Sequence, residues 1–444
     1  MVASIKASAA PASTAGRTRR KIAVIGSGIA GNTAAYRLRE HHDVTVFEAA
    51  DRVGGHTNTI DVESSAGALP VDTGFIVFND RTYPEFNRLL DEIGQDWQPS
   101  VMSFSVQSER NGLEYNGASL NAVFAQRRNA VRPSFLRMVR DILRFNRAAP
   151  GLLERGESGA TLGEYLASER YGREFTDYYL VPMAAAIWSA EPARVRDMPA
   201  YFLVRFFLHH GLLQLSDRPQ WRTVRGGSRE YVRKLVAGHA DRIRLNTPVR
   251  AIARRPDGVY IKTKNAPPER FDDVFIACHS DQALALLDDA TPVEREVLGA
   301  IPYQINDAVL HTDTRLMPRR RRAWAAWNYH VPRDTQRFVS VTYNMNILQS
   351  LPVQEQYLVT LNHGAGIDPA RVIERIEYEH PVFTRESVAA QARHAEVNSG
   401  GRTYYCGAYW RNGFHEDGVA SALAAVRHFE EAQQRGELHF RRAG

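Results

Sequence analysis

Residues 21–31, KIAVIGSGIAG, place a short apolar run directly before three glycines. A short apolar run that ends at glycine is typical of a buried parallel strand, here over residues 22–25. Residues 32–40 have the pattern of a helix, and a second apolar stretch, DVTVFE, ends at Glu48. The sequence therefore predicts a strand, a glycine turn, a helix and a second strand, which is the start of an α/β fold with a parallel sheet.

The glycines of this stretch have the spacing G-x-G-x-x-G, and Glu48 follows Gly28 by 20 residues. Gly26 permits the tight turn, Gly28 lets a pyrophosphate approach the backbone, and Gly31 lets the helix pack close to the strand. The helix N-terminus offers free N–H groups to the phosphates, and Glu48 can accept hydrogen bonds from the ribose hydroxyls. The pattern predicts a Rossmann-like dinucleotide site at the carboxyl ends of the strands.

Composition narrows the class of protein. Hydrophobic residues make up 44% of the 444 residues, as in ordinary soluble domains, and no apolar run reaches the roughly 18 residues of a membrane-spanning helix. Two cysteines, Cys278 and Cys406, exclude a disulfide framework and a cysteine-rich metal site, and they fit a reducing, cytoplasmic compartment. We expect no metal.

The charge of the chain bears on its partners. The 56 basic residues are 51 arginines and five lysines, and the net charge of +6 favours anionic partners.

The residues after Glu48 indicate which dinucleotide binds. EAADRVGGHTNTI places Arg52, Gly54 and Gly55 just behind the ribose acid, and this continuation resembles the FAD motif of the amine oxidase and phytoene desaturase superfamily. Further segments resemble that superfamily in the same order: 71–79, 224–236, 243–263, 271–287 and 403–426. The resemblance implies non-covalent FAD in contact with Gly26, Ser27, Gly28, Ile29, Ala30, Gly31, Glu48, Arg52, Gly54, Gly55, His56, Thr57, Gly74, Phe75, Val249, Glu416, Asp417 and Gly418.

Three segments resemble one branch of the superfamily more closely: AWNYHVP at 326–332, VSVTYNMNILQSL at 339–351 and GFHEDG at 413–418. This branch is related to the N-terminal domain of plant cyclopropane fatty acid synthases. The resemblance implies work on fatty acyl chains beside a lipid methyltransferase. It does not fix the reaction.

The order of the motifs predicts an amine-oxidase-like architecture. A discontinuous FAD-binding domain is expected over residues 21–80, 222–288 and 395–440. An inserted α+β substrate domain is expected over residues 81–221 and 289–394. Residues 1–20, which are low in complexity and carry no acid, predict a disordered tail, with a targeting segment as the alternative.

Three stretches bear on a membrane partner. Residues 133–147 place Phe135, Leu136, Val139, Ile142 and Leu143 on one predicted helix face, with arginines on the others. Residues 198–213 are strongly apolar but too short to span a bilayer. Both stretches are interpreted either as helices packed on the core or as contacts with lipid, and the second also as the wall of an apolar tunnel. The run Arg319–Arg322 is either a solvated loop or a further headgroup contact.

Candidate residues for the substrate side come from the last third of the chain. His415, in GFHEDG, is the predicted catalytic residue, because a neutral imidazole beside the flavin can relay a proton or orient the substrate. The alternative is a structural histidine. Cys406 lacks the superfamily's attachment sequence and is expected to be a small buried residue. The predicted substrate pocket consists of Tyr329, His330, Tyr343, Asn344 and Trp410.

The function that we predict is an FAD-dependent oxidoreductase, a dehydrogenase or desaturase of unsaturated or methyl-branched fatty acyl chains of membrane lipids. Amine oxidases of the superfamily typically place a lysine near the flavin, and no lysine follows Lys264 here, which counts against amine oxidation. The alternatives are an oxidase of a small soluble amine and a non-enzymatic FAD-binding partner of a lipid methyltransferase. We expect a cytoplasmic protein, peripheral on an anionic membrane, and no nucleic acid partner, since no recognition motif accompanies the basic charge.

Overall fold

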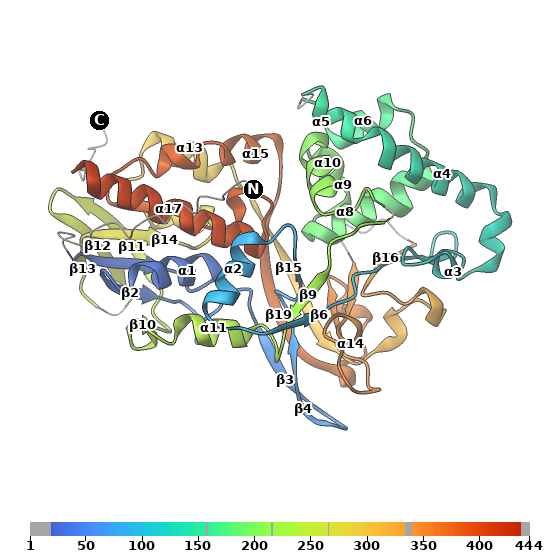
Figure 1. Ribbon diagram of the computed structural model, residues 1–444, viewed down its shortest axis with the longest axis horizontal. Helices are drawn as coiled ribbons and strands as arrows, with labels where there is room; N and C mark the ends of the chain where they lie inside the picture. The colour runs from blue at the N-terminus through green and yellow to red at the C-terminus, as the bar shows by residue number, and fades with distance from the viewer. Residues whose placement is uncertain (1–18, 157–158, 215, 265, 334–339, 437–444) are drawn as a thin grey trace, which may run out of the picture.

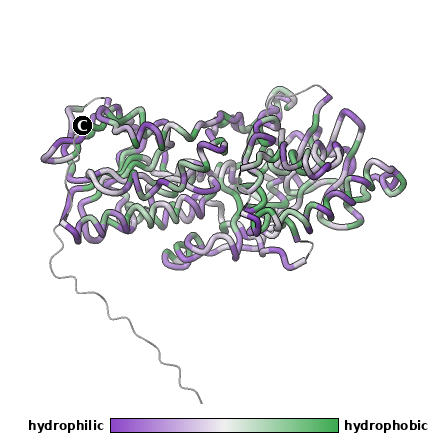
Figure 2. Tube along the Cα trace, turned by 90° about the horizontal axis from the view of Figure 1, so that it is seen from above, coloured by the Kyte–Doolittle hydropathy of each residue, from purple (hydrophilic) through white to green (hydrophobic). Residues whose placement is uncertain are grey.

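The computed structural model describes residues 19–156, 159–214, 216–264, 266–333 and 340–436. It forms an elongated molecule in which a nucleotide-binding half and a helix-rich half lie side by side (Figure 1). The predicted tail over residues 1–20 lies almost wholly outside the described residues. Hydrophobic residues are concentrated along the inner segments of both halves (Figure 2), as expected for two adjoining cores.

The nucleotide-binding half is built on a parallel sheet with the strand order β10-β2-β1-β14-β20. The predicted first strand is β1 (Lys21–Ile25), and the predicted second strand is β2 (Asp43–Phe47). The other three come from far along the chain: β10 (Ile243–Arg244), β14 (Asp273–Ile276) and β20 (Thr403–Tyr405). The predicted parallel α/β sheet is confirmed, and its inner strands β1, β2 and β14 are largely buried because both faces of the sheet are covered there.

Alternate residues of β1 enter different cores. Ile22 and Val24 pack under α1 (Ile29–Leu38) and α17 (His415–Arg435), and Ala23 and Ile25 face the other layer. That layer includes the antiparallel sheet β11-β12-β13 and helix α13. Helix α1 begins at Ile29, three residues before the predicted start, so its N-terminus opens directly from the glycine turn. The layer's elements are β11 (Val249–Arg255), β12 (Gly258–Thr263), β13 (Glu269–Phe271), α12 (Ser280–Leu286), α13 (Pro292–Gly299), α15 (Arg385–Gln391) and α16 (His394–Val397).

The second half combines a mixed sheet with a group of helices. The sheet order is β19-β15-β18-β17-β16-β7-β8. Its strands are β7 (Phe104–Ser108), β8 (Leu113–Asn116), β15 (Tyr303–His311), β16 (Trp327–Val331), β17 (Val341–Asn344), β18 (Leu358–Leu361) and β19 (Val372–Pro381). The helices are α3 (Leu120–Val123), α4 (Pro133–Ala148), α5 (Pro150–Glu154), α6 (Leu162–Ser168), α7 (Arg173–Phe175), α8 (Val181–Trp188), α9 (Pro192–Asp197), α10 (Ala200–His209) and α14 (Met345–Leu348).

The halves are joined more intimately than the predicted boundaries imply. A small sheet, β5-β9-β6, pairs strands from both sides of the expected boundaries at 80/81 and 221/222. Helix α2 (Pro84–Glu92) packs Phe86 into the core beside the nucleotide-binding turns. Helices α13 and α15 likewise contribute buried residues to the core of the layer that contains β11, β12 and β13. Substrate-side segments therefore complete the cofactor-side cores. The remaining elements are β3 (Thr59–Ser64), β4 (Gly67–Asp72), β5 (Phe78–Asn79), β6 (Trp97–Pro99), β9 (Trp221–Val224) and α11 (Arg229–Val236).

The two stretches singled out for lipid contact are both helical. Helix α10 buries Phe202, Leu203 and Phe207, which agrees with its interpretation as a helix packed on the core. Helix α4 buries Phe135 and leaves Leu136 and Leu143 44% and 50% exposed, so the five apolar residues do not share one face as predicted.

No helix within the described residues has the length and hydropathy needed to cross a bilayer.

Candidate active site

A single cavity of about 1000 Å³ runs from the glycine turns into the helix-rich half. Its first end is lined by the turn of residues 25–30, by Glu48 and by residues 247–249, which include Val249. Its other end is walled by side chains of α8, α10, β16, β17 and β19. The cavity therefore crosses the junction between the halves.

Glycine is required at the first end for three different reasons. Gly26 has a φ of +97°, which favours glycine. A Cβ atom on Gly31 would lie 1.9 Å from the carbonyl oxygen of Gly26, whereas a Cβ on Gly28 would meet no atom within 4 Å. Gly55 lies against Gly28, since its Cβ would be 3.1 Å from the Gly28 Cα. Gly31 thus serves packing, while Gly28 faces the open cradle that a pyrophosphate would fill.

Glu48 is fixed at the end of β2, where the ribose is expected. One carboxylate oxygen accepts hydrogen bonds from the Ser27 backbone N–H and hydroxyl at 2.8 and 2.6 Å, and the other accepts from the Ala50 N–H at 2.8 Å. A carboxylate held by backbone donors presents its remaining lone pairs to the cavity in one orientation. The open cradle at Gly28, the adjoining α1 N-terminus and this oriented acid fit the diphosphate and ribose of FAD.

Most residues expected to contact FAD lie on the cavity, and five lie behind it. Gly31 and Thr57 lie just beneath the turns. The carboxylate of Glu416 accepts from the N–H groups of Glu85 and Phe86, and that of Asp417 accepts from the N–H groups of Asn412 and Phe414. Gly418 packs on Ile29, since its Cβ would lie 2.7 Å from the Ile29 side chain. The residues that line the cavity are Gly26, Ser27, Gly28, Ile29, Ala30, Glu48, Arg52, Gly54, Gly55, His56, Gly74, Phe75 and Val249.

Of the five predicted pocket residues, only Tyr343 lines the cavity. The wall on β16 is Trp327, and Tyr329, two residues further along that strand, packs in the core beyond the cavity. His330, on the opposite face of β16, pairs with Glu109 at 3.2 Å.

Asn344 and Trp410 have structural roles: Asn344 caps a helix, and Trp410 packs in the hydrophobic core. Asn344 caps α14 by accepting from the Ile347 N–H at 3.2 Å. Trp410 packs beside His394 in the core, and its neighbour Tyr409 reaches the cavity instead. The predicted strands exist, but the cavity covers only short parts of them.

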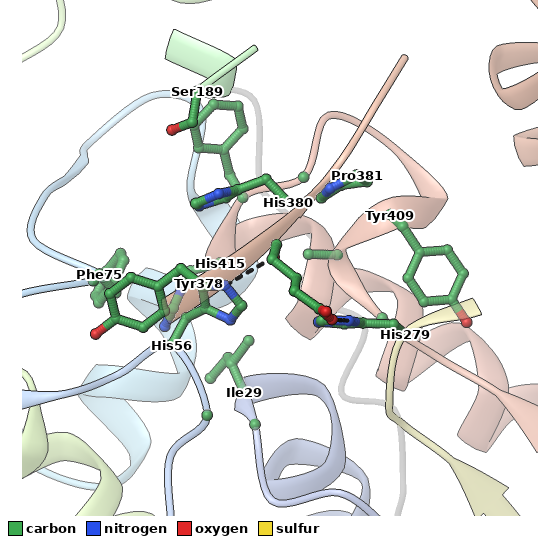
Figure 3. Close-up of a pocket in the computed structure, with 18 of the residues that line it drawn as sticks. Ile29, His56, Phe75, Ser189, His279, Tyr378, His380, Pro381, Tyr409 and His415 are labelled. Atoms are coloured by element: carbon green, nitrogen blue, oxygen red, sulfur yellow. Dashed lines mark hydrogen bonds and ion pairs between the residues drawn. The ribbon is translucent and has the colours of Figure 1, made fainter. Parts of the chain in front are cut away.

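A group of histidines lies where the two halves of the cavity meet (Figure 3). The ring centroid of His56 lies 6.2 Å from that of His279 and 5.4 Å from that of His380. His56 donates from Nε2 to the carbonyl oxygen of Glu379 at 3.1 Å, which leaves its Nδ1 as an acceptor. Burial, followed by the three neighbouring imidazoles, lowers the pKa of His56 well below its usual value. His56 is therefore neutral at pH 7.

His380 was not foreseen, and the structure fixes its tautomer. The Asn306 side chain accepts from the Asn362 amide at 2.7 Å through Oδ1, so its Nδ2 is the atom 2.9 Å from Nδ1 of His380. Since Nδ2 can only donate, Nδ1 of His380 accepts, and in the neutral ring Nε2 carries the proton. Burial, aided by His279, lowers the pKa of His380 to about 4. Nε2–H has no hydrogen-bond partner among the described residues, so it is a donor available to a ligand.

His415, the predicted catalytic residue, lines the cavity at the first residue of α17. Its ring stacks on Phe75 with centroids 3.5 Å apart, and Nε2 lies 3.0 Å from both the Thr57 hydroxyl and the Tyr231 hydroxyl. Those two hydroxyls are 2.5 Å apart. Burial lowers the pKa of His415 to about 3. The imidazole is neutral and joined to a hydroxyl pair that leads away from the cavity.

The cavity offers little fixed charge to a ligand beyond the nucleotide end. Arg52 is the only arginine among its described lining residues, and it donates to the carbonyl oxygens of Gly55 and Thr57. Glu379 is bound by His279 at 2.9 Å, and Glu377 is exposed at the edge of β19.

The remaining walls are apolar or aromatic. No lysine of the described residues lines them. Phe206 and Leu212 belong to the stretch 198–213, for which an apolar tunnel wall was one interpretation of the sequence. The wall residues outside that stretch that the sequence did not name as pocket residues are Met102, Phe104, Met183, Ile187, Trp188, Trp327, Leu361, Ile376, Tyr378, Phe383 and Phe414.

Known proteins with similar sequences include a protein named as flavin-containing and an oxidase of a porphyrinogen. The chain is 27% identical over 266 residues to AofH of Mycobacterium tuberculosis, named as a flavin-containing monoamine oxidase, covering 56% of this chain and 54% of AofH. It is 42% identical over 81 residues, 17% of each chain, to a coproporphyrinogen III oxidase of the same species. The chain thus matches about half the length of the first curated relative.

Solved structures show the same fold over nearly the whole chain. Cyclohexylamine oxidase from Brevibacterium oxydans IH-35A superposes with a TM-score of 0.67 at 16% identity, covering 94% of this chain and 100% of that one. A CLA-producing fatty acid isomerase from P. acnes gives 0.63 at 16% identity, covering 92% and 98%. At such identities the likeness establishes the fold alone.

The family assignment rests on the sequence. Residues 29–335, more than half of the chain, match the family described as flavin containing amine oxidoreductase. The match begins inside the glycine turn and extends across both halves of the cavity. The chain therefore belongs to the flavin containing amine oxidoreductases, and FAD is its cofactor.

Proposed function

We propose that the enzyme is a dehydrogenase or desaturase of fatty acyl chains that carry a double bond or a methyl branch. The observation that carries the proposal is the far end of the cavity, which has apolar and aromatic walls and neutral imidazoles at its junction with the nucleotide end. A long apolar ligand gains free energy by leaving water for such walls. A small charged ligand would find little opposite charge on the described walls, where Glu379 is bound by His279 and Glu377 lies exposed at the edge of β19.

The proposed reaction removes a hydride and a proton from adjacent carbons of the acyl chain and leaves a new C=C bond. When bound, FAD supplies the two-electron oxidant that accepts the hydride. The walls hold the acyl chain with the reacting C–H about 3–3.5 Å from the acceptor atom. A double bond next to that carbon stabilises the developing positive charge, so in an unsaturated chain the allylic positions are the targets, and a methyl branch stabilises the charge in the same sense.

His415 is the proposed proton acceptor. A carbon next to a developing allylic cation is strongly acidic, so a weak base with a pKa of about 3 suffices. Because the imidazole does not retain a proton at pH 7, the proton must move on. The hydroxyls of Thr57 and Tyr231, each 3.0 Å from Nε2, provide the route.

Amine oxidation is the second candidate, and the names of the relatives favour it. AofH is named as a monoamine oxidase, and one structural neighbour is a cyclohexylamine oxidase. An uncharged amine could also enter a cavity with neutral imidazoles. The two candidates differ in the length of the ligand: an acyl chain would extend along the apolar walls, whereas a small amine would contact only part of them.

The test is anaerobic mixing of the yellow protein with phospholipids of defined acyl chains, followed by flavin absorbance near about 450 nm. We expect bleaching by unsaturated or methyl-branched chains and none by a straight saturated chain of equal length, which is the matched control. Mass spectrometry of the extracted lipid should show the loss of two hydrogens. Bleaching by cyclohexylamine or putrescine but by no lipid would overturn the acyl proposal and establish the amine candidate.

A further inference from the structure

Helix α4 presents an exposed stripe of alternating leucine and arginine, which we call the α4 stripe: Leu136, Arg140, Leu143 and Arg147. The spacing of four, three and four residues places them on one side of a helix. Phe135, Met138 and Phe145 are buried on the opposite side. Leu136 and Leu143 are 44% and 50% exposed, so the stripe faces away from the protein.

The arginines of the α4 stripe are not used inside the protein. Arg137 pairs with Glu174 at 3.0 Å, and Arg144 lies 3.4 Å from Asp141, whereas Arg140 and Arg147 make no hydrogen bond or ion pair with any described residue. Asp141 is the only acidic residue between positions 115 and 153, a segment with seven arginines. It is 4% exposed, so this segment presents positive charge to solvent with little compensation from its own acidic residues.

Neighbouring segments extend the same surface. Leu120, at the start of α3, and Val131, just before α4, are both 80% exposed. The arginine run Arg319–Arg322 is exposed and lies next to α3 through the short helix Arg321–Ala323. Chain segments about 190 residues apart thus bring exposed aliphatic side chains and exposed arginines to the end of the molecule that carries α3 and α4 (Figure 1), although Arg320 is paired with Glu114 at 3.2 Å.

We propose that the α4 stripe and its neighbours dock the protein on an anionic lipid bilayer. The leucines would enter the boundary between headgroups and acyl chains, and the arginines would remain among the phosphates, as their long stems allow. A nucleic acid would match the arginines but would leave Leu136 and Leu143 in water, so a bilayer accounts for both side-chain types. The proposal does not depend on the acyl substrate, because docking is measured without turnover.

The test compares two fourfold variants of the flavin-loaded protein. The stripe variant carries Leu136→Gln, Arg140→Gln, Leu143→Gln and Arg147→Gln. The control variant replaces two aliphatic residues and two arginines that are exposed elsewhere: Leu245→Gln, Ile373→Gln, Arg295→Gln and Arg427→Gln. Both lose two positive charges, and both should keep the parent's flavin absorbance and thermal midpoint, since every substituted side chain is exposed.

Binding is measured by co-sedimentation with vesicles of phosphatidylcholine containing about one third phosphatidylglycerol. We expect parent and control to bind, the stripe variant to bind at least about 10-fold more weakly, and pure phosphatidylcholine to bind little of any of them. Parent binding should weaken as salt rises, because the Debye length falls from about 10 Å at 0.1 M to about 3 Å at 1 M. Equal binding of stripe and control variants would overturn the proposal. So would tighter binding of the parent to duplex DNA than to these vesicles.

Discussion

The two ends of the cavity are built by different means. The nucleotide end is made mostly of backbone: the turns at Gly26–Gly28 and Gly54–Gly55, with one acid, Glu48, held by backbone N–H groups. The far end is made of side chains from helices and strands scattered between Met102 and Phe414. A backbone cradle needs a fixed short sequence, whereas an apolar wall requires only bulk and can be assembled from any element that reaches it.

This comparison predicts that substitutions at the nucleotide end have all-or-none effects and those at the far end graded ones. Gly31→Ala places a Cβ 1.9 Å from the Gly26 carbonyl oxygen, and a clash with backbone should exceed the roughly 1–3 kcal/mol typical of overpacking. Gly28→Ala points into open space, so that protein should fold without flavin. Circular dichroism and the flavin-to-protein absorbance ratio distinguish the two outcomes.

Gly117→Ala is the control, since its Cβ would make only an ordinary 3.8 Å contact. It should retain both fold and flavin. A Gly28→Ala protein with normal flavin content would show that the pyrophosphate lies elsewhere.

The second prediction concerns how the flavin is held. Cys406 is fully buried and lies outside the cavity lining, and burial raises the pKa of Cys278, which does line it, to about 12. Neither thiol is therefore a thiolate at pH 7, the form that reacts. Acid precipitation should release all flavin into the supernatant, and Cys406→Ala should bind as much flavin as the parent. A yellow pellet that becomes colourless in Cys278→Ala or Cys406→Ala would establish a thioether.

The third prediction tests whether His415, where the two halves of the cavity meet, takes part in the reaction. His415→Ala should retain FAD but slow flavin reduction by the acyl substrate about 10²-fold, the lower end of the usual effect of a general base. Tyr231→Phe removes one hydroxyl near Nε2 while keeping the ring, and it should have a smaller effect in the same direction. Stopped-flow absorbance gives both rates. If His415→Ala is reduced as fast as the parent, the histidine is structural.

The fourth and smallest effect is on stability against pH. The pKa of His380 is about 4 in the folded protein and about 6.5 when unfolded, so between those values the unfolded chain binds more protons. Folding stability therefore falls as the pH drops from 7 to 5, by about 2 kcal/mol for this group. His380→Gln should show a loss smaller by that amount in urea denaturation at the two pH values. The same pH dependence in parent and variant would mean that His380 is solvated.

The sequence was informative where a few adjacent residues determine the geometry. The turn at Gly26–Gly31 and the acid at Glu48 could be assigned because their roles depend on spacing within one strand–helix–strand unit. His380 and Asn306 could not be paired in this way. They lie 74 positions apart on neighbouring antiparallel strands, and only the register of β15 with β19 brings them together.

Two errors show why the walls were harder to predict. Tyr329 was placed on the correct strand, but the position along β16 where the cavity ends depends on helices that pack from elsewhere. On α4, apolar residues occur on more than one side of the helix, so hydrophobicity alone could not distinguish the buried Phe135 from the exposed Leu136. Tertiary packing decided both cases.

The parallel sheet also has a consequence for how the enzyme matures. Its central strands β1 and β2 leave the ribosome first, but the outer strand β20 and helix α17 lie in the last tenth of the chain. At about 5–20 residues per second, the interval between β2 and β20 is on the order of tens of seconds. A nascent chain therefore carries an unfinished cofactor cavity until residues 403–435 have emerged, because residues 407–409 and 412–415 line it, and flavin capture is expected only after that point.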